Sequence, residues 1–242
     1  MNESQHDAIA VIIGRAGSKG LPGKNSRLVA GLPMVAHAIG HARSSRHVRQ
    51  VVVSTDGEEI ARAARATGTD VVMRPPLLAG DTASVDCAVR HAVESLGVSH
   101  RIVVILYANV PVRPPGLVDR AVEHLVSTGA DSVQSYESVG KKHPWWMSRM
   151  DESGRIVPWH RNDVYRRQDL PAVVAAAKSC TLSSGGALPQ TVRQRARTSS
   201  GTHLLTLRSN GCTRYRCSRD DSRKRLALRR LPLLHAQGSD RW

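Results

Sequence analysis

The sequence predicts an α/β protein with a Rossmann-like, doubly wound and mostly parallel sheet. Short runs of Val, Ile and Ala, such as 8–13 and 101–106, alternate with amphipathic helical patterns over the first 173 residues. Continuous apolar strands between helices are typical of a parallel sheet that helices cover on both faces. The length of 242 residues is sufficient for one such domain with a substantial core.

Each expected element follows from a local signal in the sequence. Strands are predicted where β-branched residues run together, at 8–13, 50–54, 70–73, 101–106 and 131–136. Helices are predicted where apolar residues recur every three to four positions, at 34–42, 58–67, 83–96 and 115–127. We expect Asp56 to cap the helix that starts at 58, and Asp81 and Thr82 to cap the helix that starts at 83.

Charge divides the chain at about residue 173. Residues 174–242 hold 14 Lys and Arg against three Asp, a net charge of +11, whereas residues 1–173 carry only +4. The alternation of apolar segments also fades beyond Val173. We therefore predict an α/β domain at 1–173 and an Arg-rich tail at 174–242, and we expect the sheet to lack its C-terminal strands and helix.

Composition also narrows the class of protein. No segment approaches ~18 consecutive apolar residues, and the N-terminus lacks the basic and apolar layout of a signal peptide, so we expect a cytoplasmic protein without a membrane partner. The four cysteines form no Cys-x-x-Cys pair, so the sequence supports neither a zinc site nor a disulfide framework.

The loop after the first strand carries the clearest chemical signal. Residues 14–25 contain four glycines together with Arg15, Lys19 and Lys24. Glycines let a backbone approach a ligand closely, and cations beside free N–H groups suit a polyphosphate. The loop is not a Walker A motif, because Asn25 follows its Gly-Lys pair, and it does not match Gly-x-Gly-x-x-Gly.

Three further motifs follow along the chain. They read Arg-Pro-Pro-Leu-Leu-Ala-Gly-Asp-Thr-Ala-Ser from Arg74, Leu-Tyr-Ala-Asn-Val-Pro-Val-Arg up to Arg113, and Tyr-Arg-Arg-Gln-Asp-Leu-Pro at 165–171. With the glycine-rich loop, they resemble the motifs of the cytidylyltransferases that activate acidic sugars, above all the CMP-N-acylneuraminate synthetases. The resemblance spans about residues 8–173, although Tyr107 replaces the Gln that is usual in this family.

The resemblance implies that CTP and an acidic sugar react to give a CMP-sugar and pyrophosphate. It implies catalytic roles for Arg15 and Lys24, which would hold the triphosphate. The implied nucleotide-binding residues are Gly17, Ser18, Lys19, Gly20, Asn25, Arg74, Asp81, Thr82 and Ser84. The implied sugar-binding residues are Tyr107, Asn109, Arg113, Arg166 and Gln168.

The resemblance also implies a magnesium ion and a homodimer. The family's Asp-x-Asp pair, which holds Mg²⁺, is absent from this sequence, so no residue is assigned to the metal. The dimer would form through residues 141–170, where Trp145 and Trp146 follow a His-Pro pair and are read as part of a flap or dimer arm. These tryptophans have no basic stripe around them, so we expect no nucleic-acid partner.

Alternatives remain open for the substrate and for the tail. The sugar could instead be another 2-keto acid, namely KDO, pseudaminic or legionaminic acid, and a protein of another class would bind nucleic acid through the basic tail. The tail could also be a translation in the wrong reading frame. Read one base forward, the codons for 176–182 allow Pro-Asn-x-Ala-x-Tyr and those for 213–217 allow Asp-Ile-Asp, which the family carries. We favour this reading, and it implies a weakly active or inactive chain.

Overall fold

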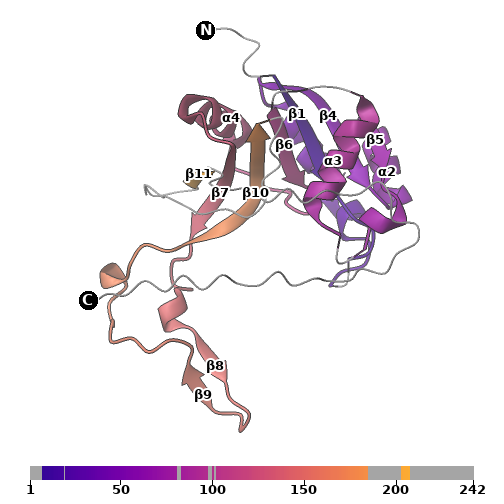
Figure 1. The fold of residues 1–242 in the computed structure, drawn as a ribbon. Coiled ribbons are helices and arrows are strands. Elements are labelled where there is room, and N and C mark those ends of the chain that lie inside the picture. Colours follow the sequence, from indigo (N-terminus) through magenta and orange to yellow (C-terminus); the bar gives the residue numbers. More distant parts are fainter. Residues whose placement is uncertain are drawn as a thin grey trace, which may run out of the picture.

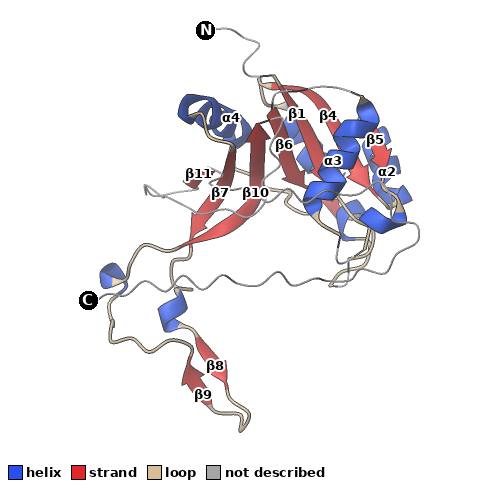
Figure 2. Ribbon diagram, in the orientation of Figure 1, coloured by secondary structure: helices blue, strands red, loops and turns tan. Residues whose placement is uncertain are grey.

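In the part of the chain that it describes, the computed structural model shows a central sheet of seven strands (Figures 1 and 2). The structure describes residues 7–18, 20–80, 83–97, 100, 102–184 and 203–207. The strands of the sheet lie in the order β11-β7-β10-β6-β1-β4-β5. Their bounds are β1 Ala8–Ile13, β4 Val48–Thr55, β5 Asp70–Met73, β6 Ile102–Tyr107, β7 Ser132–Ser138, β10 Val174–Ser184 and β11 His203–Leu207.

The sheet is mostly parallel. Strand β1 pairs in parallel with β4 and β6, and β4 pairs in parallel with β5. Strand β10 is antiparallel to both β6 and β7, so β7 runs in the same direction as β6. Edge strand β11 is antiparallel to β7. The predicted Rossmann-like sheet is therefore confirmed.

Helices cover both faces of the sheet because its strands are apolar on both sides. In β1, Ala8, Ala10 and Ile12 pack with α1, α2 and α4, whereas Ile9 and Val11 pack with α3 on the opposite face. All six residues of β1 are buried, which is the pattern expected for a central parallel strand. The helices are α1 Met34–Arg43, α2 Glu58–Arg65, α3 Val85–Leu96 and α4 Leu117–Thr128.

A long excursion, residues 139–173, leaves the sheet between β7 and β10, and we call it the arm. Its hairpin, β8 Ser148–Met150 and β9 Ile156–Pro158, extends away from the body of the protein (Figure 1). At its base, His143 accepts a hydrogen bond from the Trp145 N–H at Nδ1 and lies 3.1 Å from the Pro171 carbonyl at Nε2. The short hairpin β2 Leu28–Val29 and β3 Leu32–Pro33 lies before α1.

The structure differs from the prediction beyond residue 173. Strand β10 begins at Val174 and lies inside the sheet, so the α/β domain continues past the predicted boundary. The register of β10 shifts between Ala176 and Thr181, where Ser135 donates to the Ala177 carbonyl and accepts from the Cys180 N–H. The expectation that the tail contributes no strand is therefore wrong for Val174–Ser184 and His203–Leu207. Strand β10 pairs with the open sides of β6 and β7 despite its weakly apolar sequence.

Two predicted helix caps are also wrong. Helix α3 starts at Val85, and its N-cap is Ser84, whose hydroxyl accepts from the Cys87 N–H at 3.1 Å. The predicted caps Asp81 and Thr82 lie outside the described residues. Helix α2 has Gly57 as its N-cap without a side-chain hydrogen bond, and the preceding Asp56 bonds to another loop instead.

Candidate nucleotide site

A cavity of about 420 Å³ opens at the carboxyl ends of β1, β5 and β6. Parallel strands end at the same edge of the sheet, and this edge is where open α/β sheets bind their ligands. Nine of the predicted site residues line it, from the glycine-rich loop and from the segments after the other strands. They are Arg15, Ser18, Gly20, Lys24, Asn25, Arg74, Ser84, Tyr107 and Asn109.

The start of the glycine-rich loop is fixed by three side chains from different segments. Arg74 donates from Nη2 to the Gly14 carbonyl, at 2.5 Å. Asn25 donates from Nδ2 to the Arg15 carbonyl at 2.9 Å. The Asp56 carboxylate accepts from the Ala16 N–H, also at 2.9 Å. Three consecutive residues of the loop are thus each held by a different side chain.

Close packing against the segments that follow β4 and β6 also fixes the glycine-rich loop. A Cβ atom on Gly57 would lie 2.9 Å from the Ala16 Cβ, and one on Gly14 would lie 3.1 Å from the Ala108 Cβ. Both distances are shorter than ordinary contacts, so these positions favour glycine because of space. The loop therefore packs directly onto the ends of β4 and β6.

Two buried polar atoms at the cavity lack a hydrogen-bond partner among the described residues, namely Asn25 Oδ1 and Arg74 Nε. One is an acceptor and the other is a donor. An unpaired buried polar group costs about 1–3 kcal/mol, so a polar ligand that pairs with either atom would recover that free energy. Both residues were predicted to bind the nucleotide.

The cavity wall is cationic. Arg15, Lys24 and Arg74 line it, and no Asp or Glu is among the described residues that do so. Burial lowers the pKa of Arg74, and the carboxylate of Asp56, 3.9 Å away, opposes this effect. Arginine stays protonated at neutral pH. The site can therefore neutralise the charge of a bound polyphosphate.

Two uncharged polar side chains of the cavity wall, Tyr107 and Ser84, can donate hydrogen bonds. Burial, and secondarily the carboxylate of Asp86, raises the pKa of Tyr107, so its phenol remains protonated at neutral pH. The Ser84 hydroxyl oxygen already accepts from the backbone of α3, which leaves its O–H free to donate toward the cavity.

The remaining predicted residues do not meet at this cavity. Gly17 belongs to the same loop but is not part of the cavity wall. Lys19, Asp81 and Thr82 lie outside the described residues. Arg166 lies in the arm, where it pairs with Asp169, and Gln168 occupies the adjacent short 3₁₀ turn, Arg167–Asp169.

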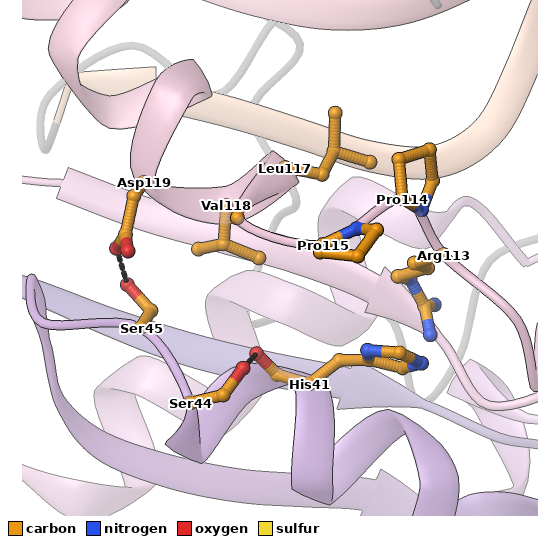
Figure 3. Close-up of a pocket in the computed structure, with 10 residues that line it drawn as sticks. His41, Ser44, Ser45, Arg113, Pro114, Pro115, Leu117, Val118 and Asp119 are labelled. Atoms are coloured by element: carbon orange, nitrogen blue, oxygen red, sulfur yellow. Dashed lines mark hydrogen bonds between the residues drawn. The ribbon is translucent and has the colours of Figure 1, made fainter.

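Arg113 is buried and its hydrogen bonds are internal. Its guanidinium donates to the carbonyls of Tyr107, Val110 and Ser179 at 2.8, 2.6 and 2.7 Å. It also borders a second cavity beside His41 and Asp119, shown in Figure 3. That cavity measures only about 40 Å³, close to the volume of one water molecule, and it offers no space for a nucleotide.

No group of three or more His, Cys, Asp or Glu side chains in the described part of the chain is placed to hold a metal ion. The described residues that line the cavity include no Asp or Glu, so they do not fit a protein-held Mg²⁺ site. Asp56, the nearby carboxylate that sequence reasoning assigned to a helix cap, is engaged by the Ala16 N–H and faces Arg74. No local sequence pattern indicates that Asp56 contacts Ala16, because the two residues are 40 positions apart in the chain.

The fold and the site define a class of Rossmann-like α/β proteins with a cationic cavity where a glycine-rich loop follows the first strand. The structure of a CMP:2-keto-3-deoxy-manno-octonic acid synthetase solved with CTP has this fold, with a TM-score of 0.57 and 19% identity over 74% of each chain. A family model described as cytidylyltransferase matches residues 9–194, and the chain belongs to that family.

Curated relatives agree with this assignment. The chain is 39% identical to a CMP-N,N'-diacetyllegionaminic acid synthase of Legionella pneumophila, over 62% of this chain and 65% of that protein. It is 33% identical to an N-acylneuraminate cytidylyltransferase of Streptococcus agalactiae, over 67% of this chain and 40% of that protein. The chain thus spans less than two thirds of either relative. Among the described residues, no helix is both long and apolar enough to cross a membrane.

Proposed function

We propose that the protein transfers the cytidylyl group of CTP to an acidic sugar of the sialic acid type. The observation that carries the proposal is the cationic cavity under a glycine-rich loop whose first three residues are each held by another side chain. The relatives named for legionaminic and N-acylneuraminic acid support a 2-keto sugar acid as the acceptor.

The reaction joins the anomeric oxygen of the sugar to the α-phosphorus of CTP. The bond from that phosphorus to the β-phosphate oxygen breaks, pyrophosphate leaves with the bonding electrons, and the hydroxyl proton passes to solvent. Arg15 and Lys24 would neutralise charge on the phosphates, and catalysis would come chiefly from positioning and this neutralisation. Ser84 and Arg74 would bind the cytosine, whose carbonyl oxygen and ring nitrogen accept hydrogen bonds.

A requirement for magnesium belongs to the proposal as well, although the described residues do not form its site. Mg²⁺ would screen phosphate charge when bound. Turnover measured at increasing Mg²⁺ and a fixed CTP concentration tests this requirement. Turnover in EDTA that equals turnover in Mg²⁺ would contradict it. A CTP-dependent reaction also supports a cytoplasmic location.

The homodimer is proposed from the arm. Its exposed apolar side chains include Met147, Met150, Ile156 and Trp159, which are 46%, 68%, 67% and 63% exposed. Arg166 and Gln168 lie in the same arm, outside the wall of the chain's own cavity. A second copy would bury the apolar side chains and would let these two residues reach a neighbouring site.

The direct test is pyrophosphate release from CTP with a panel of N-acetylneuraminic, legionaminic, pseudaminic and KDO acids. We expect release to depend on both CTP and one of these sugars, with little release from other nucleoside triphosphates. If no sugar acid in the panel supports release by this chain or by a reading-frame-corrected version, the proposed function is wrong.

A further inference from the structure

The carboxylate of Asp56 lies between the glycine-rich loop and the Arg74 side chain, behind the wall of the cavity. It follows β4, whose end packs against the glycine-rich loop, and it is mostly buried, with 20% of its side chain exposed. Its Oδ1 accepts from the Ala16 N–H at 2.9 Å. The same oxygen lies 3.9 Å from Nη2 of Arg74, a side chain that is only 5% exposed.

These contacts place the Asp56 carboxylate between the glycine-rich loop and the Arg74 guanidinium, and both of these contribute to the cavity wall. The Arg74 Nη2 atom also donates hydrogen bonds to the carbonyls of Gly14 and Ser54. Contacts therefore connect Ala16 to Asp56, Asp56 to Arg74, and Arg74 to Gly14 in the same loop. Without the carboxylate, the Ala16 N–H would lose its acceptor and the buried guanidinium would lose its nearest negative charge.

We propose that Asp56 is a positioning residue, which holds the glycine-rich loop and Arg74 in the arrangement that binds the nucleotide. The inference rests on the proposed function, because the ligand it serves is CTP. Asp56 is not part of the cavity wall and acts through Ala16 and Arg74. Its removal should therefore weaken nucleotide binding and leave recognition of the sugar unchanged.

Three variants separate the two contacts. Asp56→Ala removes both, whereas Asp56→Asn keeps an oxygen acceptor for the Ala16 N–H and removes only the charge. Gly57→Ala keeps the carboxylate but introduces a Cβ 2.9 Å from the Ala16 Cβ, which displaces the loop without a change in charge. The matched control is Glu58→Ala, since Glu58 pairs with the exposed Arg65 and lies 68% exposed.

Calorimetry with CTP alone gives the main measurement. We expect Asp56→Ala and Gly57→Ala to raise the dissociation constant of CTP about tenfold, Asp56→Asn to raise it less, and the control to leave it unchanged; tenfold corresponds to about 1.4 kcal/mol. In turnover, the KM for CTP should rise while the KM for the sugar acid stays the same. Hydrogen exchange should be faster in the peptide that contains Ala16.

The possible failures are distinguishable. If the unaltered chain and its frame-corrected version bind no CTP, the proposed function is overturned and this inference with it. If either binds CTP and Asp56→Ala binds it as tightly, only the positioning role is overturned. Should Asp56→Ala fail to fold, the Asp56→Asn and Gly57→Ala variants decide, and unchanged CTP binding by both would contradict the role.

Discussion

Arg113 shows how one residue can match a family motif and still act inside the fold. The family resemblance implied a sugar-binding role for it. In the structure it is 4% exposed and donates to three backbone carbonyls. One belongs to Tyr107 at the end of β6, one to Val110 in the segment that follows, and one to Ser179 in β10. It therefore ties the segment that carries Tyr107 to the neighbouring antiparallel strand.

Replacement of Arg113 by Lys should destabilise the fold even though the charge is retained. A single ammonium group lacks the planar, forked geometry that serves three carbonyls at once. Loss of two charge-assisted hydrogen bonds should lower the free energy of unfolding by about 3 kcal/mol. Denaturant titration measures the change, and Arg49→Lys, in an exposed pair with Asp7, is the control. Equal losses in the two variants would contradict the structural role.

We expect the buried thiol of Cys180 to make the free energy of unfolding depend on pH in the alkaline range. Complete burial raises the pKa of its thiol from 9.0 to about 12, an effect that Arg113 partly opposes. Because the folded pKa is the higher one, the thiol's contribution is full below pH 9 and is lost as pH rises toward 12. Each pH unit within this window should cost about 1.4 kcal/mol.

The measurement compares the free energy of unfolding at pH 8 and pH 10.5 under reducing conditions. We expect Cys180→Ala to start less stable at pH 8, because it leaves a small cavity, and then to lose less stability between the two pH values than the unaltered chain. Cys87→Ala on α3, where the thiol is only partly buried, serves as the control. A pH dependence identical in all three proteins would contradict the assignment to Cys180.

At the scale of elements, the sequence predicted best those strands whose bounds follow from a local run of apolar residues. The bounds of β1 and β5 agree residue for residue, because continuous apolar runs between turns leave little choice. The caps of α2 and α3 were missed, because a carboxylate or hydroxyl can serve either a helix or a distant loop. Strand β10 was missed because Ala and Ser dominate it, and its pairing partners lie far away in the chain.

The candidate site also has a part that the sequence predicts and a part that it does not. The glycine-rich loop and the residues after β5 and β6 could be predicted, because strand order in a parallel sheet brings those loops to one edge. The contact of Asp56 with Ala16 and the hydrogen bond of Arg113 to Ser179 join residues 40 and 66 positions apart in the sequence, and no local pattern records such contacts.

The arm supports a prediction about assembly. Met150 and Ile156 face each other across the β8–β9 pairing and are exposed, so their replacement by Thr should cost the isolated chain little stability. If the arm forms the dimer, the double variant should weaken self-association at least tenfold in sedimentation equilibrium. A matched double variant at Leu28 and Leu32 removes exposed apolar surface elsewhere. Unchanged association of the arm variant would exclude this hairpin from the interface.

At the scale of the whole molecule, charge is distributed unevenly. The net charge is +15, and the last 69 residues carry +11 of it. Such a segment could bind nucleic acid through its Arg residues, and this binding would fall steeply with salt. The cationic cavity of the domain, by contrast, is lined by residues that all lie between Ile13 and Asn109.

The reading frame of the tail provides the decisive comparison for the whole chain. In a version read one base forward beyond the segment 170–180, the codons allow the Asp-x-Asp pair that this chain lacks. Such a pair would supply the carboxylates that the described cavity wall lacks. We expect this version to show Mg²⁺-dependent turnover of CTP at least tenfold above that of the present chain. It should also lose any salt-sensitive binding to RNA that the present chain shows. Equal turnover by the two versions, with the present frame confirmed by peptide mass, would establish residues 174–242 as a genuine part of the protein.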